Sequence, residues 1–287
     1  MKRTVAYLAL AVCASFLAAC SMTRLGYDYA DTVVRYMASN YLDLDAVQSE
    51  DLKPRLVRLH HWHRVNELPA YAALLRSASQ RAAKGITAED VAWGLGNVRA
   101  RYRRFAAQAV EDAAPVLATL GLAQLTALEH KFAENNEKFA KQFLSQDDKK
   151  RRRAQTKRML ERFRDFAGDL TLEQEARIER FALAHERHVA LRFEDRQRWQ
   201  RDVVALLRQQ RAPQELGRRL AGMFNEPELR RSDEFIREDK RWDEDLGQLI
   251  VDLDRSLSFE QRARVVRRLS DYAEDFSVLA GRKGQAA

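Results

Sequence analysis

The sequence predicts an all-α fold, a multi-helix bundle in which sequential helices pack as antiparallel neighbours. Glycine (11) and proline (5) make up about half of their usual share of the 287 residues, so the chain lacks the turns of strand-rich folds. Apolar residues recur at three- and four-residue spacing, as in Leu52, Leu56 and Leu59, and strand-like alternation is absent. The connections between periodic stretches are short, which favours antiparallel packing of neighbouring helices.

The periodicity predicts ten helices within one domain over residues 25–280. Several prolines stand near the starts of periodic stretches, where a missing backbone N–H costs little. Residues 281–287 are expected to form a frayed tail. The predicted helices span residues 25–40, 46–68, 69–83, 88–113, 122–144, 147–167, 172–210, 214–224, 228–255 and 259–280.

A five-residue motif occurs four times, each time with leucine first and glutamine last. In two copies a hydroxyl residue follows the leucine, which gives a capping box at a helix start. The hydroxyl accepts from the third helical amide, and the glutamine accepts from the cap amide. Asp45 can cap its own helix start, and Gly121 is a tolerated cap. The four copies are Leu44–Gln48, Leu120–Gln124, Leu170–Gln174 and Leu257–Gln261.

The N-terminus carries the features of a bacterial export signal. Two basic residues precede an apolar stretch over residues 5–19, which has the length of a signal-peptide core and is short for a bilayer span. The stretch ends in a sequence that resembles the lipobox of bacterial lipoproteins. Its residues are Leu17, Ala18, Ala19 and Cys20.

The lipobox resemblance implies diacylglyceryl attachment to Sγ of Cys20, cleavage before this residue and acylation of the new amine. The chain would then divide into a signal peptide over 1–19, a lipidated tether over 20–24 and the helical domain. Serine at position 21, rather than aspartate, resembles the enterobacterial sorting signal for the outer membrane. We therefore expect a lipoprotein that is anchored there through Cys20 and faces the periplasm, with the inner membrane as the less favoured location.

The predicted cleavage and periplasmic location also limit the possible partners. Cleavage would leave Cys20 as the only cysteine, which excludes a disulfide within one mature chain. Loss of the two basic leader residues leaves 48 lysines and arginines against 42 acids, a net charge of +6. A basic periplasmic protein is suited to anionic headgroups or peptidoglycan, whereas nucleic acid is not available there.

The chain is similar to a family of uncharacterised proteobacterial lipoproteins. The resemblance rests on an early Leu-Gly-Tyr segment at residues 25–27, and on motifs over residues 41–48, 59–64 and 67–71. It would cover nearly the whole mature chain. It implies a lipobox and an all-helical body, and it brings no activity.

A second resemblance, to periplasmic chaperones of the Spy and CpxP type, rests on their repeated Leu-Thr-x-x-Gln motif. Residues 170–174 match it in full, and residues 257–261 match with serine for threonine. The resemblance implies a dimeric, cradle-shaped binder of unfolded clients or an envelope-stress sensor. The alternative is that the motifs are helix caps without a functional relation.

Two histidine pairs provide a possible metal site. His60 and His63, and likewise His185 and His188, are three positions apart, so each pair shares a helix face. Four imidazoles could bind zinc or copper if the two helices met. Partly buried or surface histidines without a ligand are the default interpretation.

The densest basic run, Lys149–Arg153, is interpreted either as a solvated helix face or as a docking site for anionic lipid, peptidoglycan or a partner protein. The sequence contains no nucleophile elbow, phosphate-binding loop or dinucleotide turn, so we expect neither an enzyme nor a cofactor. The expected function is a tethered binding or scaffolding protein of unknown specificity. Its alternatives are the chaperone or stress sensor and a divalent-metal-binding protein.

Overall fold

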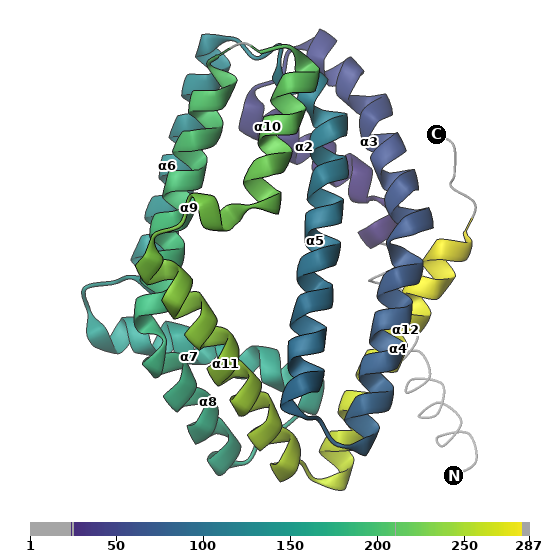
Figure 1. Ribbon diagram of the computed structural model, residues 1–287, viewed down its shortest axis with the longest axis vertical. Helices are drawn as coiled ribbons and strands as arrows, with labels where there is room; N and C mark the ends of the chain where they lie inside the picture. The colour runs from purple at the N-terminus through teal and green to yellow at the C-terminus, as the bar shows by residue number, and fades with distance from the viewer. Residues whose placement is uncertain (1–23, 25, 210, 283–287) are drawn as a thin grey trace, which may run out of the picture.

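The computed structural model describes residues 24, 26–209 and 211–282, and within them it confirms the all-α prediction. Eleven α-helices and one short 3-10 helix follow one another without a strand in the described part of the chain (Figure 1). Their bounds are α2 (Ala30–Leu42), α3 (Ala46–Asn66), α4 (Leu68–Lys84), α5 (Ala88–Leu117), α6 (Leu122–Phe143), α7 (Asp148–Ala167), α8 (Leu172–Ala184), α9 (Glu186–Leu207), α10 (Pro213–Asn225), η1 (Pro227–Leu229), α11 (Asp233–Ser256) and α12 (Phe259–Gly281).

The helices are arranged as a ring (Figure 1). Its most extensive packing joins helices that are far apart in the chain: α4 with α12, and α5 with α10. The second half of the chain thus closes back onto the first. Some sequential pairs also pack together, among them α3 with α4 and α7 with α8.

Some of the buried apolar residues form two separate clusters. One lies among α5, α6, α9 and α10 and includes Val110, Leu125 and Leu216. The other joins α8 to α11 through residues that include Ile178 and Leu249. Each cluster stabilises a different part of the ring by removing apolar surface from water.

The four Leu-to-Gln motifs pair two by two across the chain. Near the starts of α3 and α6, Gln48 and Gln124 donate to each other's side-chain oxygens at 3.2 and 2.6 Å. Near the starts of α8 and α12, Gln174 and Gln261 do the same at 3.1 and 2.9 Å. We refer to these reciprocal pairs as the first and second glutamine clasps. They connect helix starts that are 76 and 87 residues apart.

The two clasps follow one geometric rule. Each glutamine also donates to the carbonyl oxygen five residues before its partner glutamine. These bonds are Gln48 to Thr119, Gln124 to Asp43, Gln174 to Ser256 and Gln261 to Asp169. Each glutamine oxygen accepts from the cap amide of its own helix, at 2.9–3.1 Å. The capping interpretation is therefore confirmed. In addition to capping its own helix, each motif makes a tertiary contact with a second motif.

One predicted helix is divided in the structure. The sequence predicts a single helix over 172–210, whereas α8 ends at Ala184 and α9 begins at Glu186. His185 leaves the helical region with φ −111° and ψ 23°. Its ring is buried and lies 4.5 Å, centroid to centroid, from Phe181. The contact fixes a bend that the apolar periodicity does not reveal.

Residues 1–19, for which the sequence predicts a signal peptide, Cys20 and the end of the predicted tail (283–287) lie outside the described residues. Among the residues that are described, no helix has the length and apolar character needed to cross a bilayer.

Candidate functional site

The first histidine pair lies among aromatic rings. His63 Nδ1 is 2.9 Å from the Tyr27 hydroxyl, and its ring meets Phe105 edge to face. Burial lowers the pKa of His63 to about 4, and burial also lowers the pKa of His60. Both imidazoles are therefore neutral packing groups near pH 7.

The second pair lies beside α11. His188 Nε2 is 3.0 Å from Asp239 Oδ1, and its ring stacks on Trp242 with 5.4 Å between centroids. Burial lowers the pKa of His185, whose Nε2 lies 3.2 Å from Asp245 Oδ2.

The two pairs do not come together. His60 and His63 belong to α3, and the other pair lies at the α8–α9 junction on the opposite side of the ring (Figure 1). In the described part of the chain, no group of three or more histidine, cysteine, aspartate or glutamate residues is arranged to hold a metal ion. The four-imidazole arrangement that the metal hypothesis needs is thus not formed.

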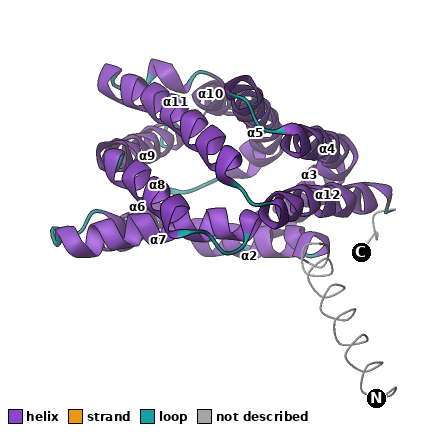
Figure 2. Ribbon diagram, turned by 90° about the horizontal axis from the view of Figure 1, so that it is seen from below, coloured by secondary structure: helices purple, strands orange, loops and turns teal. Residues whose placement is uncertain are grey.

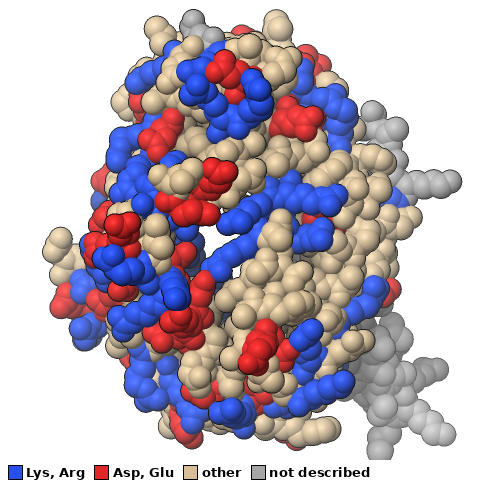
Figure 3. All heavy atoms as spheres, in the orientation of Figure 1, with Lys and Arg blue, Asp and Glu red and all other residues tan. Residues whose placement is uncertain are grey.

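A cleft on the face shown in Figure 3 is lined by arginine and aromatic side chains. It has a volume of about 530 Å³ and lies among α5, α9, the α10–η1 connection and the start of α11. Residues 188, 192, 195, 196 and 199 line it from one face of α9, since they recur at three- and four-residue spacing. Figure 3 shows lysine and arginine side chains around the hollow in the middle of this face.

The cleft is strongly basic and partly aromatic. Six of its residues are arginines and two are aspartates, Asp195 and Asp239. Five aromatic side chains, excluding the histidine, also line the cleft. The arginines are Arg99, Arg103, Arg192, Arg196, Arg230 and Arg231, and the aromatic residues are Tyr102, Trp199, Phe224, Phe235 and Trp242.

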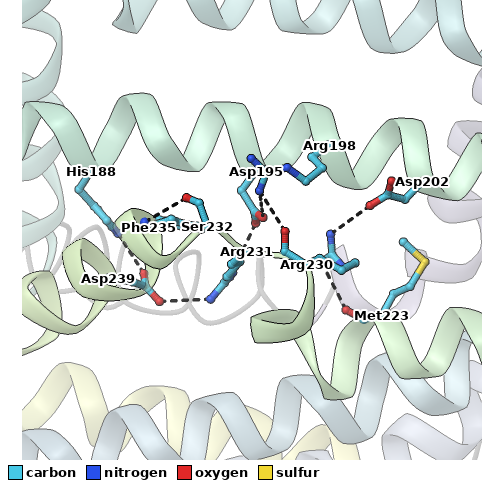
Figure 4. Close-up of polar contacts among 10 residues, drawn as sticks. All are labelled: His188, Asp195, Arg198, Asp202, Met223, Arg230, Arg231, Ser232, Phe235 and Asp239. Atoms are coloured by element: carbon cyan, nitrogen blue, oxygen red, sulfur yellow. Dashed lines mark hydrogen bonds and ion pairs between the residues drawn. The ribbon is translucent and has the colours of Figure 1, made fainter.

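Part of the cleft wall is an ordered polar chain (Figure 4). Asp239 accepts from His188 at 3.0 Å and from Arg231 Nη1 at 3.3 Å. Arg231 Nε lies 3.5 Å from Asp195 Oδ2, and the guanidinium lies 4.7 Å from the ring centre of Phe235. Arg231 is therefore held between two carboxylates and an aromatic face.

The hydrogen-bond donors of Arg230 are less completely paired than those of Arg231 (Figure 4). Its Nη2 donates to the Met223 carbonyl at 3.5 Å, and its Nη1 lies 3.8 Å from Asp202 Oδ2, beyond hydrogen-bond distance. Its Nε and Nη1 are buried without a hydrogen-bond partner among the described residues. A buried donor without a partner costs about 1–3 kcal/mol, which an anionic oxygen in the cleft would offset.

Three arginines of the cleft, unlike Arg230, have no counter-charge among the described residues. Arg103, Arg192 and Arg196 are exposed, and no carboxylate of the described residues lies within 4.0 Å of their nitrogens. By contrast, Arg99 contacts Asp243 at 2.6 Å. The cleft thus has an excess of positive charge over bound negative charge.

The cleft residues do not stand out in the sequence. They come from four segments, and each arginine taken alone is typical of a solvated helix face. The densest basic run of the sequence, Lys149–Arg153, lies on α7 and does not line the cleft. Arg151 and Arg152 of that run contact Glu186 at 3.2 and 3.3 Å.

The fold and the cleft define a helical ring protein with an arginine-rich, aromatic-lined cleft. Residues 40–237 match a family of unknown function, DUF6279, and the chain belongs to this family because the match covers more than half of its length. No curated protein and no solved structure matches the chain. The resemblance to an uncharacterised family is thereby confirmed, and no similarity to Spy or CpxP proteins is found.

Proposed function

We propose that the protein is a periplasm-facing lipoprotein of the outer membrane, tethered through Cys20, that binds an anionic ligand in the arginine-rich cleft. The lipobox residues support the tether. The observation that carries the binding role is a set of incompletely paired guanidinium groups in one cleft. Arg103, Arg192 and Arg196 have no carboxylate partner among the described residues, and Arg230, although near Asp202, has two buried donors without a hydrogen bond. A guanidinium presents its donors in a planar fork that fits carboxylate and phosphate oxygens.

The cleft also indicates the kind of anion. Its volume of about 530 Å³ is in the range of small-ligand sites, so a single inorganic ion would fill little of it. The rings of Tyr102 and Trp199 offer apolar faces beside the arginines. We propose a carboxylate-bearing fragment of peptidoglycan as the ligand, since such a fragment combines anionic groups with sugar rings. Because the cleft is rich in charge, we do not extend the proposal to capture of unfolded clients.

The cleft is tested by removing two of its unpaired cations. Arg192→Ala together with Arg196→Ala is expected to weaken binding of a soluble muropeptide at least tenfold, since a hydrogen bond to a charged group contributes about 1.5–3 kcal/mol. Isothermal titration calorimetry measures the affinity. Binding to the unchanged protein is expected to weaken as salt rises from 50 to 500 mM, because exposed charges are screened.

The matched control is Lys53→Ala with Arg267→Ala, which removes two exposed cations without carboxylate partners from α3 and α12. This control changes the net charge equally and is expected to leave the affinity unchanged. Equal weakening in both variants would show nonspecific charge attraction instead of a site. Pyrophosphate, tested in parallel, distinguishes a preference for phosphate from one for carboxylate.

The tether is tested at Cys20. Cys20→Ala is expected to abolish labelling of the chain by radioactive palmitate and to release the protein from the membrane fraction if the signal peptide is still removed. Gel autoradiography and mass determination of the N-terminus measure both properties. Retention of the label in this variant would refute the lipoprotein proposal.

A further inference from the structure

Helix α2 and its N-cap residue Tyr29 present an uncharged apolar stripe to solvent. Tyr29, Val33, Tyr36 and Met37 are 60%, 52%, 73% and 51% exposed. Their spacing of four, three and one positions places them on one helix face. The other exposed residues of α2 are Val34 (45% exposed), Thr32 and Asn40. In a chain with 32% charged residues, a helix whose exposed residues carry no charge is unusual.

The stripe is held in a fixed place on the ring. Just before α2, Arg24 Nε contacts Asp275 Oδ1 of α12 at 2.7 Å. Asp28 contacts Arg64 of α3 at 3.2 Å and Arg282, just after α12, at 2.6 Å. These contacts connect the beginning of the described chain to α3 and to the C-terminal part of α12, so the position of α2 relative to the ring is fixed.

The basic helix α7 lies on the same side of the ring. Figure 2 places α2 and α7 along one edge and places α10 and α11 along the opposite edge. Exposed lysines and arginines recur along α7, among them Lys149, Lys150, Arg153, Lys157 and Arg162. An apolar stripe on the same side of a protein as a basic helix is typical of a surface that lies on anionic lipid.

The proposed lipid anchor is close to this stripe. Cys20 is four residues before Arg24, which limits the chain between them to about 14 Å at 3.3–3.6 Å per residue. A bilayer that holds the acyl chains of Cys20 is therefore within short reach of the start of α2.

We propose that the exposed face of α2 lies in the headgroup region of the membrane that anchors the chain, with α7 above the same surface. This inference rests on the proposed tether. The tyrosine rings suit the interface between headgroups and acyl chains. The contacts of Arg24 and Asp28 then fix one orientation of the ring, in which the edge formed by α10 and α11 faces away from the bilayer.

The test replaces the natural anchor, so that its outcome does not depend on lipidation. The contacts that build the ring lie within residues 24–282, so a chain from residue 20 with Cys20→Ser contains the whole described fold and no cysteine. A hexahistidine tag before residue 20 attaches it to vesicles of phosphatidylethanolamine, phosphatidylglycerol and a nickel-chelating lipid. Met37→Cys carries an NBD fluorophore, and lipids with a doxyl group near the headgroup act as quenchers.

We expect quenching of at least half of the NBD fluorescence at position 37. The matched control is NBD at Val98→Cys on α5, whose side chain is 57% exposed, and this probe is expected to stay unquenched. Val33→Glu with Tyr36→Glu is expected to remove the quenching at position 37, because carboxylates on the stripe oppose insertion. Circular dichroism confirms that each variant is folded.

Quenching that is equal at positions 37 and 98, or absent at both, would overturn the orientation. That result would leave the palmitate test of Cys20 unaffected, since the vesicle experiment uses a different anchor. The opposite combination is also distinguishable. If the palmitate test of Cys20 fails and NBD at position 37 is quenched on the vesicles, the contact of α2 with the bilayer is supported and the natural tether is not.

Discussion

Replacement of Gln174 by alanine is expected to lower the free energy of unfolding by about 3 kcal/mol. The side chain is 1% exposed and serves four groups of the second clasp. Its oxygen accepts from the Thr171 amide at 3.0 Å and from Gln261 Nε2 at 2.9 Å, and its amide donates to the Ser256 carbonyl at 3.0 Å and to Gln261 Oε1 at 3.1 Å. Alanine would leave the cap amide and a carbonyl unpaired in a buried place, at about 1 kcal/mol or more each.

Chemical denaturation with urea measures this loss. Gln248→Ala on the exposed face of α11 is the control, and it is expected to change stability by less than about 0.5 kcal/mol. The double variant with Gln261→Ala is expected to lose about 1 kcal/mol less than the sum of the two single variants, because the reciprocal bonds are lost only once. Strict additivity would show that the two glutamines act as separate helix caps.

The clasps illustrate what a sequence can and cannot reveal. The capping role follows from the three-residue spacing of Thr171 to Gln174 and of Ser258 to Gln261, since a cap is a local contact. The pairing of motifs does not follow, because 76 residues separate Gln48 from Gln124 and 87 separate Gln174 from Gln261. Only the closed ring brings those helix starts together.

The helix boundaries show the same difference between local features, which the sequence reveals, and long-range contacts, which it does not. Short-range periodicity predicted most helices within a few residues, because each apolar face is visible along the chain. The bend at His185 was missed because the apolar spacing continues through it. The cause of the bend is a buried ring whose partners, Phe181 and Asp245, become visible only after α8 and α11 are packed.

The cleft was missed for a related reason. A chain with 50 lysines and arginines offers many exposed cations, and the sequence does not show which of them lack a counter-ion. The metal hypothesis depended on a long-range contact that the sequence does not show. It required a contact between α3 and the α8–α9 junction, and the ring places these elements on opposite sides.

Simultaneous replacement of Arg101, which is partly exposed, and Arg104, which is exposed, by alanine is expected to cost about 3–5 kcal/mol of stability. Both arginines belong to α5 and serve Glu67, a residue between α3 and α4 whose side chain is completely buried. Arg104 Nε lies 2.8 Å from Glu67 Oε1, and Arg101 Nη1 lies 3.6 Å from Oε2. Without them the carboxylate would stay buried with no counter-charge.

The rescue experiment separates this electrostatic cause from a loss of packing. Glu67→Gln, added to the double alanine variant, is expected to restore at least half of the lost stability in urea denaturation, because a neutral amide costs less to bury than a carboxylate. Arg103→Ala, on the same helix but without a carboxylate partner, is expected to change stability by less than about 0.5 kcal/mol. A failure of Glu67→Gln to restore stability would mean that the arginine stems, and not their charges, support this junction.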